Sequence, residues 1–183
     1  MVEGHDLGPA TSPVEMMAYD ASITYRNPVP AMADRARDAS REGRLLGLQC
    51  PICKRITVGG DRPYCAVDGV ELGPDDEIDL ADRGTVSNFV VVTPVQFPGQ
   101  AETEPFGCVF VLLDDSNVVL AYQQTIELPA AELRVGMRVS AVWASPGEAD
   151  AVSGIGRSMG ALLGWMPNGE PDIDDPDLVN RIY

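Results

Sequence analysis

Two short turns with potential metal ligands constrain this sequence more than any other feature. The first is Cys50-Pro-Ile-Cys53, and the second is Cys65-Ala-Val-Asp68. The patterns C-x-x-C and C-x-x-D, about one small hairpin apart, let four side chains converge on one tetrahedral ion, as in a zinc ribbon. Nothing else in the sequence is typical of an assembled active site. The residues therefore indicate a metal-stabilised module joined to a β-barrel. They favour a binding role over a catalytic one.

We expect a structural zinc ion held by Cys50, Cys53, Cys65 and Asp68. Thiolates are the preferred zinc ligands, whereas a carboxylate oxygen is a harder and less usual one. Two alternatives stay open at this point: zinc held by the three thiolates and another ligand, and a ribbon held by packing alone. A catalytic zinc needs an open position and a nearby base, and the one histidine, His5, is interpreted as a surface residue near the terminus.

Composition limits the classes of partner. The 183 residues are 45% hydrophobic, which is enough for one hydrophobic core and a small second cluster. One or two domains are therefore expected. The net charge of −15 argues against nucleic acid, because phosphate binding needs a concentration of cations. Residues 31–62 form a basic island, with seven Lys and Arg residues against four acids. This island is either a solvated face or a site for an acidic partner or a phosphorylated cofactor.

The sequence also indicates a compartment. No apolar run is long enough to cross a bilayer, and the start has no signal-peptide pattern, so a membrane location is not expected and cytoplasm is the default. Four cysteines in a reducing compartment favour a metal site over disulfides. The fourth, Cys108, lies inside an apolar strand and is interpreted as a buried core thiol.

The N-terminal half predicts one helix and a ribbon. Residues 1–22 are interpreted as a flexible arm. Pro30 suits the start of a helix over 31–42, which would bury one face and end at Gly43. Strands are expected at 45–48 and 55–58, with Gly59-Gly60 as the hairpin turn. The acidic stretch 72–82 is interpreted as the connector between the two modules.

The C-terminal half is β-rich. Strands are predicted at 85–95, 106–113, 118–126 and 138–144, with a short helix or turn at 128–133. Four or five strands at this spacing suit a small closed barrel such as a five-stranded OB-fold. From residue 145 the pattern dissolves into a glycine-rich connector and an acidic tail without a core of its own. We therefore expect a mostly β chain with four parts: 1–22, the helix and ribbon 23–73, the OB-fold 74–146, and a partner-binding tail 147–183.

The order of these parts resembles a known family. Three segments carry the resemblance: Arg44-Leu-Leu-Gly-Leu-Gln-Cys50-Pro-Ile-Cys53, then Pro63-Tyr-Cys-Ala-Val-Asp68-Gly69, then Arg83-Gly-Thr-Val86. Together they are similar to thiolase-associated proteins of bacteria and archaea, catalogued as a domain of unknown function, with a rubredoxin-like zinc ribbon and an OB-fold. The resemblance spans about residues 23–144. Asp68 stands where the family usually has a fourth cysteine.

The resemblance implies a non-catalytic accessory subunit. Such proteins accompany thiolase-fold enzymes that act on acyl-CoA, including sterol-carrier-type thiolases, hydroxymethylglutaryl-CoA synthases and steroid side-chain aldolases. Some relatives are paired with MaoC-type hydratases. The implied role is docking on a thiolase-like enzyme, in a hetero-oligomer of lipid or steroid metabolism. Acyl-CoA is an implied ligand of this assembly. The resemblance implies no catalytic residue in this chain.

Three other functions agree less well with the residues. A stand-alone acyl-CoA or small-ligand carrier would use the barrel, and an enzyme in its own right would need a catalytic constellation that the residues do not show. A nucleic-acid-binding OB-fold is disfavoured, because residues 88–146 contain six acids against two bases.

Overall fold

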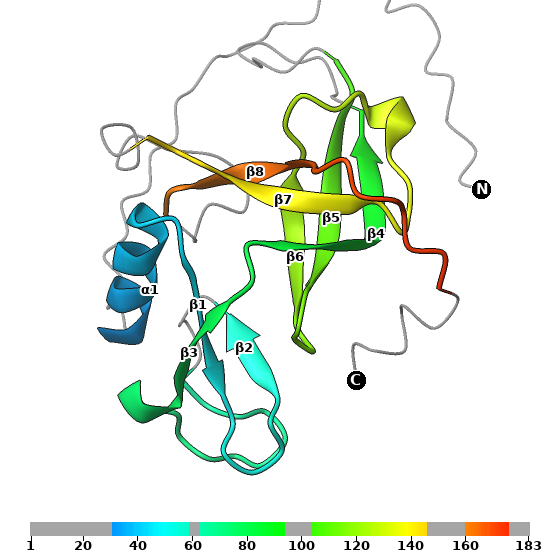
Figure 1. The fold of residues 1–183 in the computed structure, drawn as a ribbon. Helices are drawn as coiled ribbons and strands as arrows, with labels where there is room; N and C mark the ends of the chain where they lie inside the picture. Colours follow the sequence, from blue (N-terminus) through cyan, green and yellow to red (C-terminus); the bar gives the residue numbers. More distant parts are fainter. Residues whose placement is uncertain (1–30, 59–62, 94–103, 146–159, 176–183) are drawn as a thin grey trace, which may run out of the picture.

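The computed structural model describes residues 31–58, 63–93, 104–145 and 160–175. Two modules lie side by side in Figure 1: a helix with a three-stranded ribbon, and a five-stranded barrel. The predictions for the arm 1–22, the Gly59-Gly60 turn, His5 and most of the glycine-rich connector fall outside the described residues. Within those residues, no helix has both the length and the apolar character needed to cross a bilayer.

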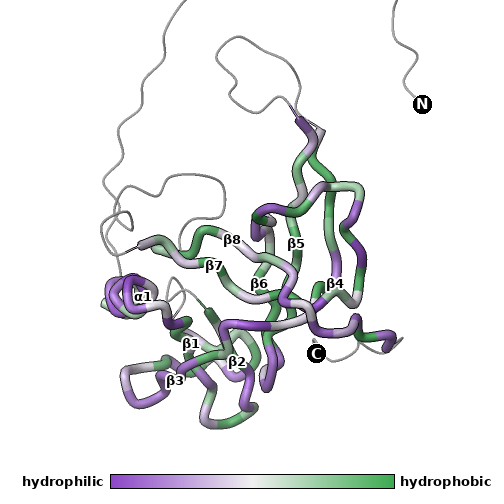
Figure 2. The backbone as a smooth tube through the Cα atoms, turned by 45° about the horizontal axis from the view of Figure 1, so that its top comes forward, coloured by the Kyte–Doolittle hydropathy of each residue, from purple (hydrophilic) through white to green (hydrophobic). Residues whose placement is uncertain are grey.

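Helix α1 (Ala31–Arg41) matches the helix expected at 31–42. Met32, Ala36 and Ala39 are buried on one face, as their spacing predicts. Gly43 follows with a φ of 73°, the left-handed conformation that glycine adopts without steric cost. Many of the other residues of α1 are hydrophilic, as its mostly purple tube in Figure 2 shows. The apolar face packs on the ribbon sheet, so the helix covers that sheet.

The ribbon sheet has the order β2-β1-β3. Its strands are β1 (Leu45–Gln49), β2 (Ile56–Val58) and β3 (Glu77–Leu80), all antiparallel. The last strand corrects the interpretation of 72–82 as a connector. A 3₁₀ turn at Pro74–Asp76 leads into β3, which pairs with β1 from Leu45↔Leu80 to Leu48↔Glu77. Its acidic residues do not prevent pairing, because Glu77 and Asp79 form ion pairs with Arg35 and Arg44.

The barrel sheet has the order β6-β5-β4-β7-β8. The strands are β4 (Arg83–Val92), β5 (Phe106–Leu113), β6 (Val119–Gln124), β7 (Arg138–Trp143) and β8 (Leu162–Pro167). A 3₁₀ turn at Ala130–Glu132 lies between β6 and β7. The first four strands agree with the predicted segments within a few residues. The mostly β class and the OB-fold are confirmed.

Strand β8 closes the barrel and was not expected from the sequence. It pairs with β7 on one side and meets β6 on the other through a parallel bridge between Thr125 and Trp165. The amide of Ile126 also donates to the carbonyl of Trp165 at 2.8 Å. The prediction of a tail without a core of its own is therefore wrong for residues 162–167. Trp165 is fully buried, so it is not a contact residue for a partner.

The two modules share one hydrophobic core. Leu45 of β1 is buried in the same cluster as Val86, Val139 and Trp165 of the barrel, and Val58 and Leu80 of the ribbon pack against it. A second cluster joins α1, the other face of β1 and the cysteine turns; it contains Met32, Ala36, Ala39, Leu46, Leu48, Cys50, Cys65 and Leu72. Since neighbouring side chains of a strand point to opposite faces, β1 contributes to both cores. The ribbon is therefore fixed on the barrel.

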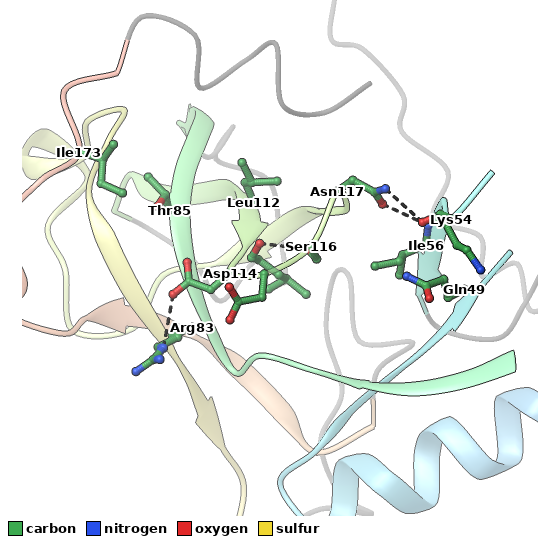
Figure 3. A pocket seen from close by; sticks show the side chains of 12 residues that line it. Gln49, Lys54, Ile56, Arg83, Thr85, Leu112, Asp114, Ser116, Asn117 and Ile173 are labelled. Atoms are coloured by element: carbon green, nitrogen blue, oxygen red, sulfur yellow. Dashed lines mark hydrogen bonds and ion pairs between the residues drawn. The ribbon is translucent and has the colours of Figure 1, made fainter. Parts of the chain in front are cut away.

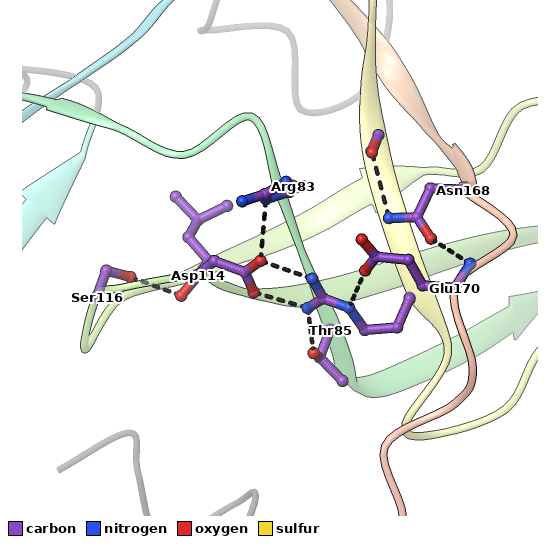
Figure 4. A network of polar contacts seen from close by, with 9 residues as sticks. Arg83, Thr85, Asp114, Ser116, Asn168 and Glu170 are labelled. Atoms are coloured by element: carbon purple, nitrogen blue, oxygen red, sulfur yellow. Dashed lines mark hydrogen bonds and ion pairs between the residues drawn. The ribbon is translucent and has the colours of Figure 1, made fainter.

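A buried arginine ties the barrel strands together (Figure 4). Arg138, at the start of β7, is only 9% exposed and contacts both oxygens of Asp114 at 2.6 Å. Its guanidinium also donates to Thr85 of β4 and to Glu170 after β8, each at 2.8 Å. The guanidinium is satisfied by bidentate and charge-assisted bonds, as a buried charge requires. This network connects the β5–β6 turn, β4, β7 and the segment after β8.

The same network predicts a pH dependence of stability. The hydrogen bond from Arg138 is the largest cause that holds the pKa of Asp114 below its ordinary value. A carboxyl group with a lowered folded-state pKa contributes stability above its unfolded pKa, about 3.9, and loses it as pH falls through the folded value. We expect the free energy of unfolding to decrease as pH drops below about 4, measured by urea unfolding.

The variant Asp114→Asn serves as the comparison. It is expected to lose about 1–3 kcal/mol at neutral pH, because a buried donor loses its charged partner. It should also show a shallower fall of stability in acid than the wild-type chain. Equal slopes in the two proteins would contradict the assignment.

Candidate metal centre

Two backbone turns of the same design carry the predicted ligands. In the first, the amide of Lys54 donates to the carbonyl of Cys50 at 3.1 Å; in the second, the amide of Gly69 donates to the carbonyl of Cys65 at 2.9 Å. Lys54 and Gly69 both have positive φ, 60° and 65°. Glycine adopts this conformation without steric cost, so the sequence signals it at Gly69 but not at Lys54. Each turn thus places its first and fourth residues on one side.

The four predicted ligand atoms come together. The Sγ of Cys50 lies 3.2 Å from Oδ2 of Asp68, and the Sγ atoms of Cys53 and Cys65 are 3.5 Å apart. All four ligand atoms lie within 4.8 Å of one another. Tetrahedral zinc with bonds of about 2.3 Å to sulfur and 2.1 Å to oxygen needs separations of roughly 3.6–3.8 Å between ligand atoms. The cluster therefore has the size and the donor set for zinc.

Burial divides the cluster into two sides. Cys50 and Cys65 are buried in the core that α1 covers, whereas Cys53 and Asp68 are reached by solvent. Two thiols thus anchor the cluster in the protein, and the other two ligands lie toward its surface. An ion here would be linked directly to the packing of α1 and β1, as expected for a structural site.

Without an ion, the four groups perturb one another's protonation. A hydrogen bond with Asp68 is the largest cause that raises the pKa of Cys53 to about 12. The backbone amide of Asp68 is the largest cause that lowers the pKa of Cys65. Hydrogen bonds from the thiols, that of Cys53 first, lower the pKa of Asp68. The metal-free cluster therefore holds protons that a cation must displace, which makes binding release protons.

The first cysteine turn is also held by the barrel. The side chain of Asn117, in the β5–β6 turn, accepts from the amide of Ile56 at 3.1 Å and donates to the carbonyl of Lys54 at 3.2 Å. Figure 3 shows this double contact at one end of an open groove of about 650 Å³. The groove runs between the ribbon and the barrel and is lined mainly by polar side chains: Gln49, Lys54, Arg83, Thr85, Asp114, Asp115, Ser116 and Asn117.

The sequence identified the ligands but not their support. Cys50, Cys53, Cys65 and Asp68 are brought together, although ligation itself stays a prediction. Cys108 is buried in β5, as expected. The role of Asn117 was missed, because a turn of Asp, Asp, Ser and Asn gives no sign that its last side chain reaches residues about sixty positions earlier.

Comparison with known families settles the class of the barrel. Residues 77–144 match the family model described as the C-terminal OB-fold domain of ChsH2. Over these residues the chain is similar to that OB-fold domain. This match includes β3 to β7 and confirms the resemblance to the OB-fold proteins found beside thiolases and aldolases.

One solved structure shows the same fold over a longer span. A chain of the "Ltp2-ChsH2(DUF35) aldolase" is 19% identical, with a TM-score of 0.53; the alignment covers 78% of this chain and 98% of that one. A protein of unknown function from the DUF35 family of Sulfolobus solfataricus is 15% identical, with a TM-score of 0.48; it covers 64% of this chain and 81% of that one. No curated protein matches the chain.

Proposed function

We propose that this chain is a non-catalytic accessory subunit that docks on a thiolase-fold acyl-CoA enzyme. The main support is the alignment with nearly the full length of a chain from an aldolase that combines Ltp2 with ChsH2. The enzyme class that we propose is a thiolase or a steroid side-chain aldolase of lipid or steroid metabolism. Zinc at Cys50, Cys53, Cys65 and Asp68 would have a structural role in this subunit.

The organisation of the chain supports a binding role. Within the described residues, the strongest cluster of titratable groups is the cysteine centre, and its ligands are tied into a packed core. The second cluster surrounds Arg138, whose guanidinium is already bonded to two carboxylates and a hydroxyl. The Arg138 network joins four segments of the barrel, and the groups of the cysteine centre are the proposed ligands of one ion. We therefore assign neither cluster the role of a nucleophile with a neighbouring base.

A stand-alone acyl-CoA carrier is less well supported. A carrier of this kind needs an apolar cavity for the acyl chain. The groove between ribbon and barrel is instead mostly polar, with ion-paired Asp114 and Arg83 at one end. The accessory role needs no such cavity.

Co-purification tests the proposal. The affinity-tagged chain, expressed in its native host, is expected to retain a thiolase-fold protein in a fixed stoichiometry, identified by mass spectrometry. Recombinant co-expression of the two chains should then reproduce the complex on size-exclusion chromatography. The proposed function fails if the tagged chain elutes alone and no thiolase-fold protein is retained.

A further inference from the structure

We propose that the tips of the two cysteine turns form the surface through which this chain contacts its enzyme partner; this rests on the proposed function and specifies its interface. The tip surface consists of Ile52, Tyr64 and Val67. Ile52 lies between the ligands of the first turn, Val67 between those of the second, and Tyr64 directly precedes Cys65.

The exposure of these side chains is the first argument. Ile52 is 63% exposed, Val67 56% and Tyr64 54%, the highest values among the large apolar residues that the structure describes. Each of the three is a sequence neighbour of a residue in the cysteine cluster, whose ligand atoms all lie within 4.8 Å of one another. The tips therefore belong to one small region. Large apolar side chains gathered on a surface typically mark an interaction site.

The rigidity of the turns is the second argument. The backbone behind Ile52 is fixed by the bond from Lys54 to Cys50 and by the contacts of Asn117. The backbone behind Val67 is fixed by the bond from Gly69 to Cys65. Side chains on a preorganised backbone lose little conformational entropy on binding, which favours affinity. The exposed tips are therefore placed as anchors.

Charge identifies the kind of partner. Most described arginines of the basic island form ion pairs within the chain: Arg35 with Glu77, Arg37 with Asp34, Arg41 with Asp38, and Arg44 with Glu42 and Asp79. In contrast, the exposed side chains of Lys54 and Arg55 have no ion-pair partner among the described residues. Both directly follow the first turn. The complementary partner is a protein surface with an apolar centre and carboxylates at its edge.

A symmetric dimer of this chain fits the surface less well. In an isologous contact, the tip surface of one chain would face the tip surface of the other. The positive charges of Lys54 and Arg55 in one chain would then lie close to the same positive charges in the other. The net charge of −15 adds repulsion between copies. The enzyme subunit is therefore the occupant that we propose.

The test uses the full-length chain and the co-purified thiolase-fold protein. The double variant Ile52→Asp with Val67→Asp is expected to raise Kd by at least about 30-fold, because carboxylates replace two anchors. Val135→Asp is the matched control, since Val135 is 50% exposed but lies just before β7. It should bind as the wild-type chain does. Zinc content and circular dichroism show whether the variants remain folded.

Hydrogen exchange of the wild-type complex gives a second test that needs no variant. Residues 50–55 and 64–69 are expected to become more protected when the enzyme binds. The inference is overturned, while the proposed function stands, if the enzyme binds but neither Kd nor exchange at the tips changes. It is also overturned if the pure chain sediments as a dimer that Ile52→Asp dissociates. If no thiolase-fold protein binds the wild-type chain, both proposals fall.

Discussion

Replacement of Cys50 by serine is expected to abolish zinc binding and to unfold the ribbon. Structural zinc sites in small modules contribute apparent binding free energies of about 10–16 kcal/mol, comparable with the whole stability of a domain. Cys50 is fully buried in the core beneath α1, so loss of the ion also disturbs that packing. Zinc content should fall from about one ion per chain to less than about 0.1, and amides of residues 45–58 should lose exchange protection.

The chain offers a matched control for this experiment. Cys108 is also buried, but it lies in β5 outside the cluster. Cys108→Ala should therefore keep the ion. Metal-free wild-type protein with a fully protected ribbon would contradict the prediction and favour a ribbon held by packing alone.

Asp68 can be tested in the same way. Asp68→Cys supplies a softer thiolate and is expected to bind zinc more tightly than the wild-type chain, whereas Asp68→Ala should bind it more weakly. Competition with a zinc chelator measures both. Equal affinities in all three proteins would mean that the fourth ligand is another group.

Trp165→Ala is expected to cost about 3–5 kcal/mol of the free energy of unfolding. Trp165 is fully buried in the core that barrel and ribbon share, and it lies on the strand that closes the barrel. Truncation leaves a large cavity and weakens the contact between β8 and β6. Urea unfolding of the full chain measures the effect.

The neighbouring residue provides the control for Trp165. Met166 lies next to it on β8 but points to the other face and is 37% exposed. Met166→Ala should change stability by about 0.5 kcal/mol or less, as surface substitutions usually do. Similar losses for the two variants would contradict the burial of Trp165 in the shared core.

The parts of the fold that local patterns determine could be predicted. Met32, Ala36 and Ala39 recur at helical spacing, so the helix and its buried face follow from periodicity. The two turns follow from ligand spacing, and β5 from its apolar run. In each case the signal lies within a few neighbouring residues.

The parts of the fold that depend on distant contacts could not be predicted from local patterns. Gly164 resembles a connector residue, yet a Cβ atom there would clash with the carbonyl oxygen of Gln124. Glycine therefore permits the close approach of β8 to β6. Likewise, β3 is held by its pairing with β1 and by Leu80 on the shared core, and its carboxylates form ion pairs with Arg35 and Arg44. Neither partner is recognisable from the local sequence.

The double contact of Asn117 with Lys54 and Ile56 has a consequence for protein engineering and for evolution. A ribbon transplanted onto another OB-fold would lack the side-chain amide of Asn117. The backbone N–H of Ile56 and the carbonyl of Lys54 would then lose their hydrogen-bonding partner. Exchange of the ribbon alone is therefore expected to lower the stability of the chimera. A chimera retains the native junction only if the β5–β6 turn is transferred together with the ribbon. The contact of Asn117 therefore predicts that the two modules are best exchanged as one unit.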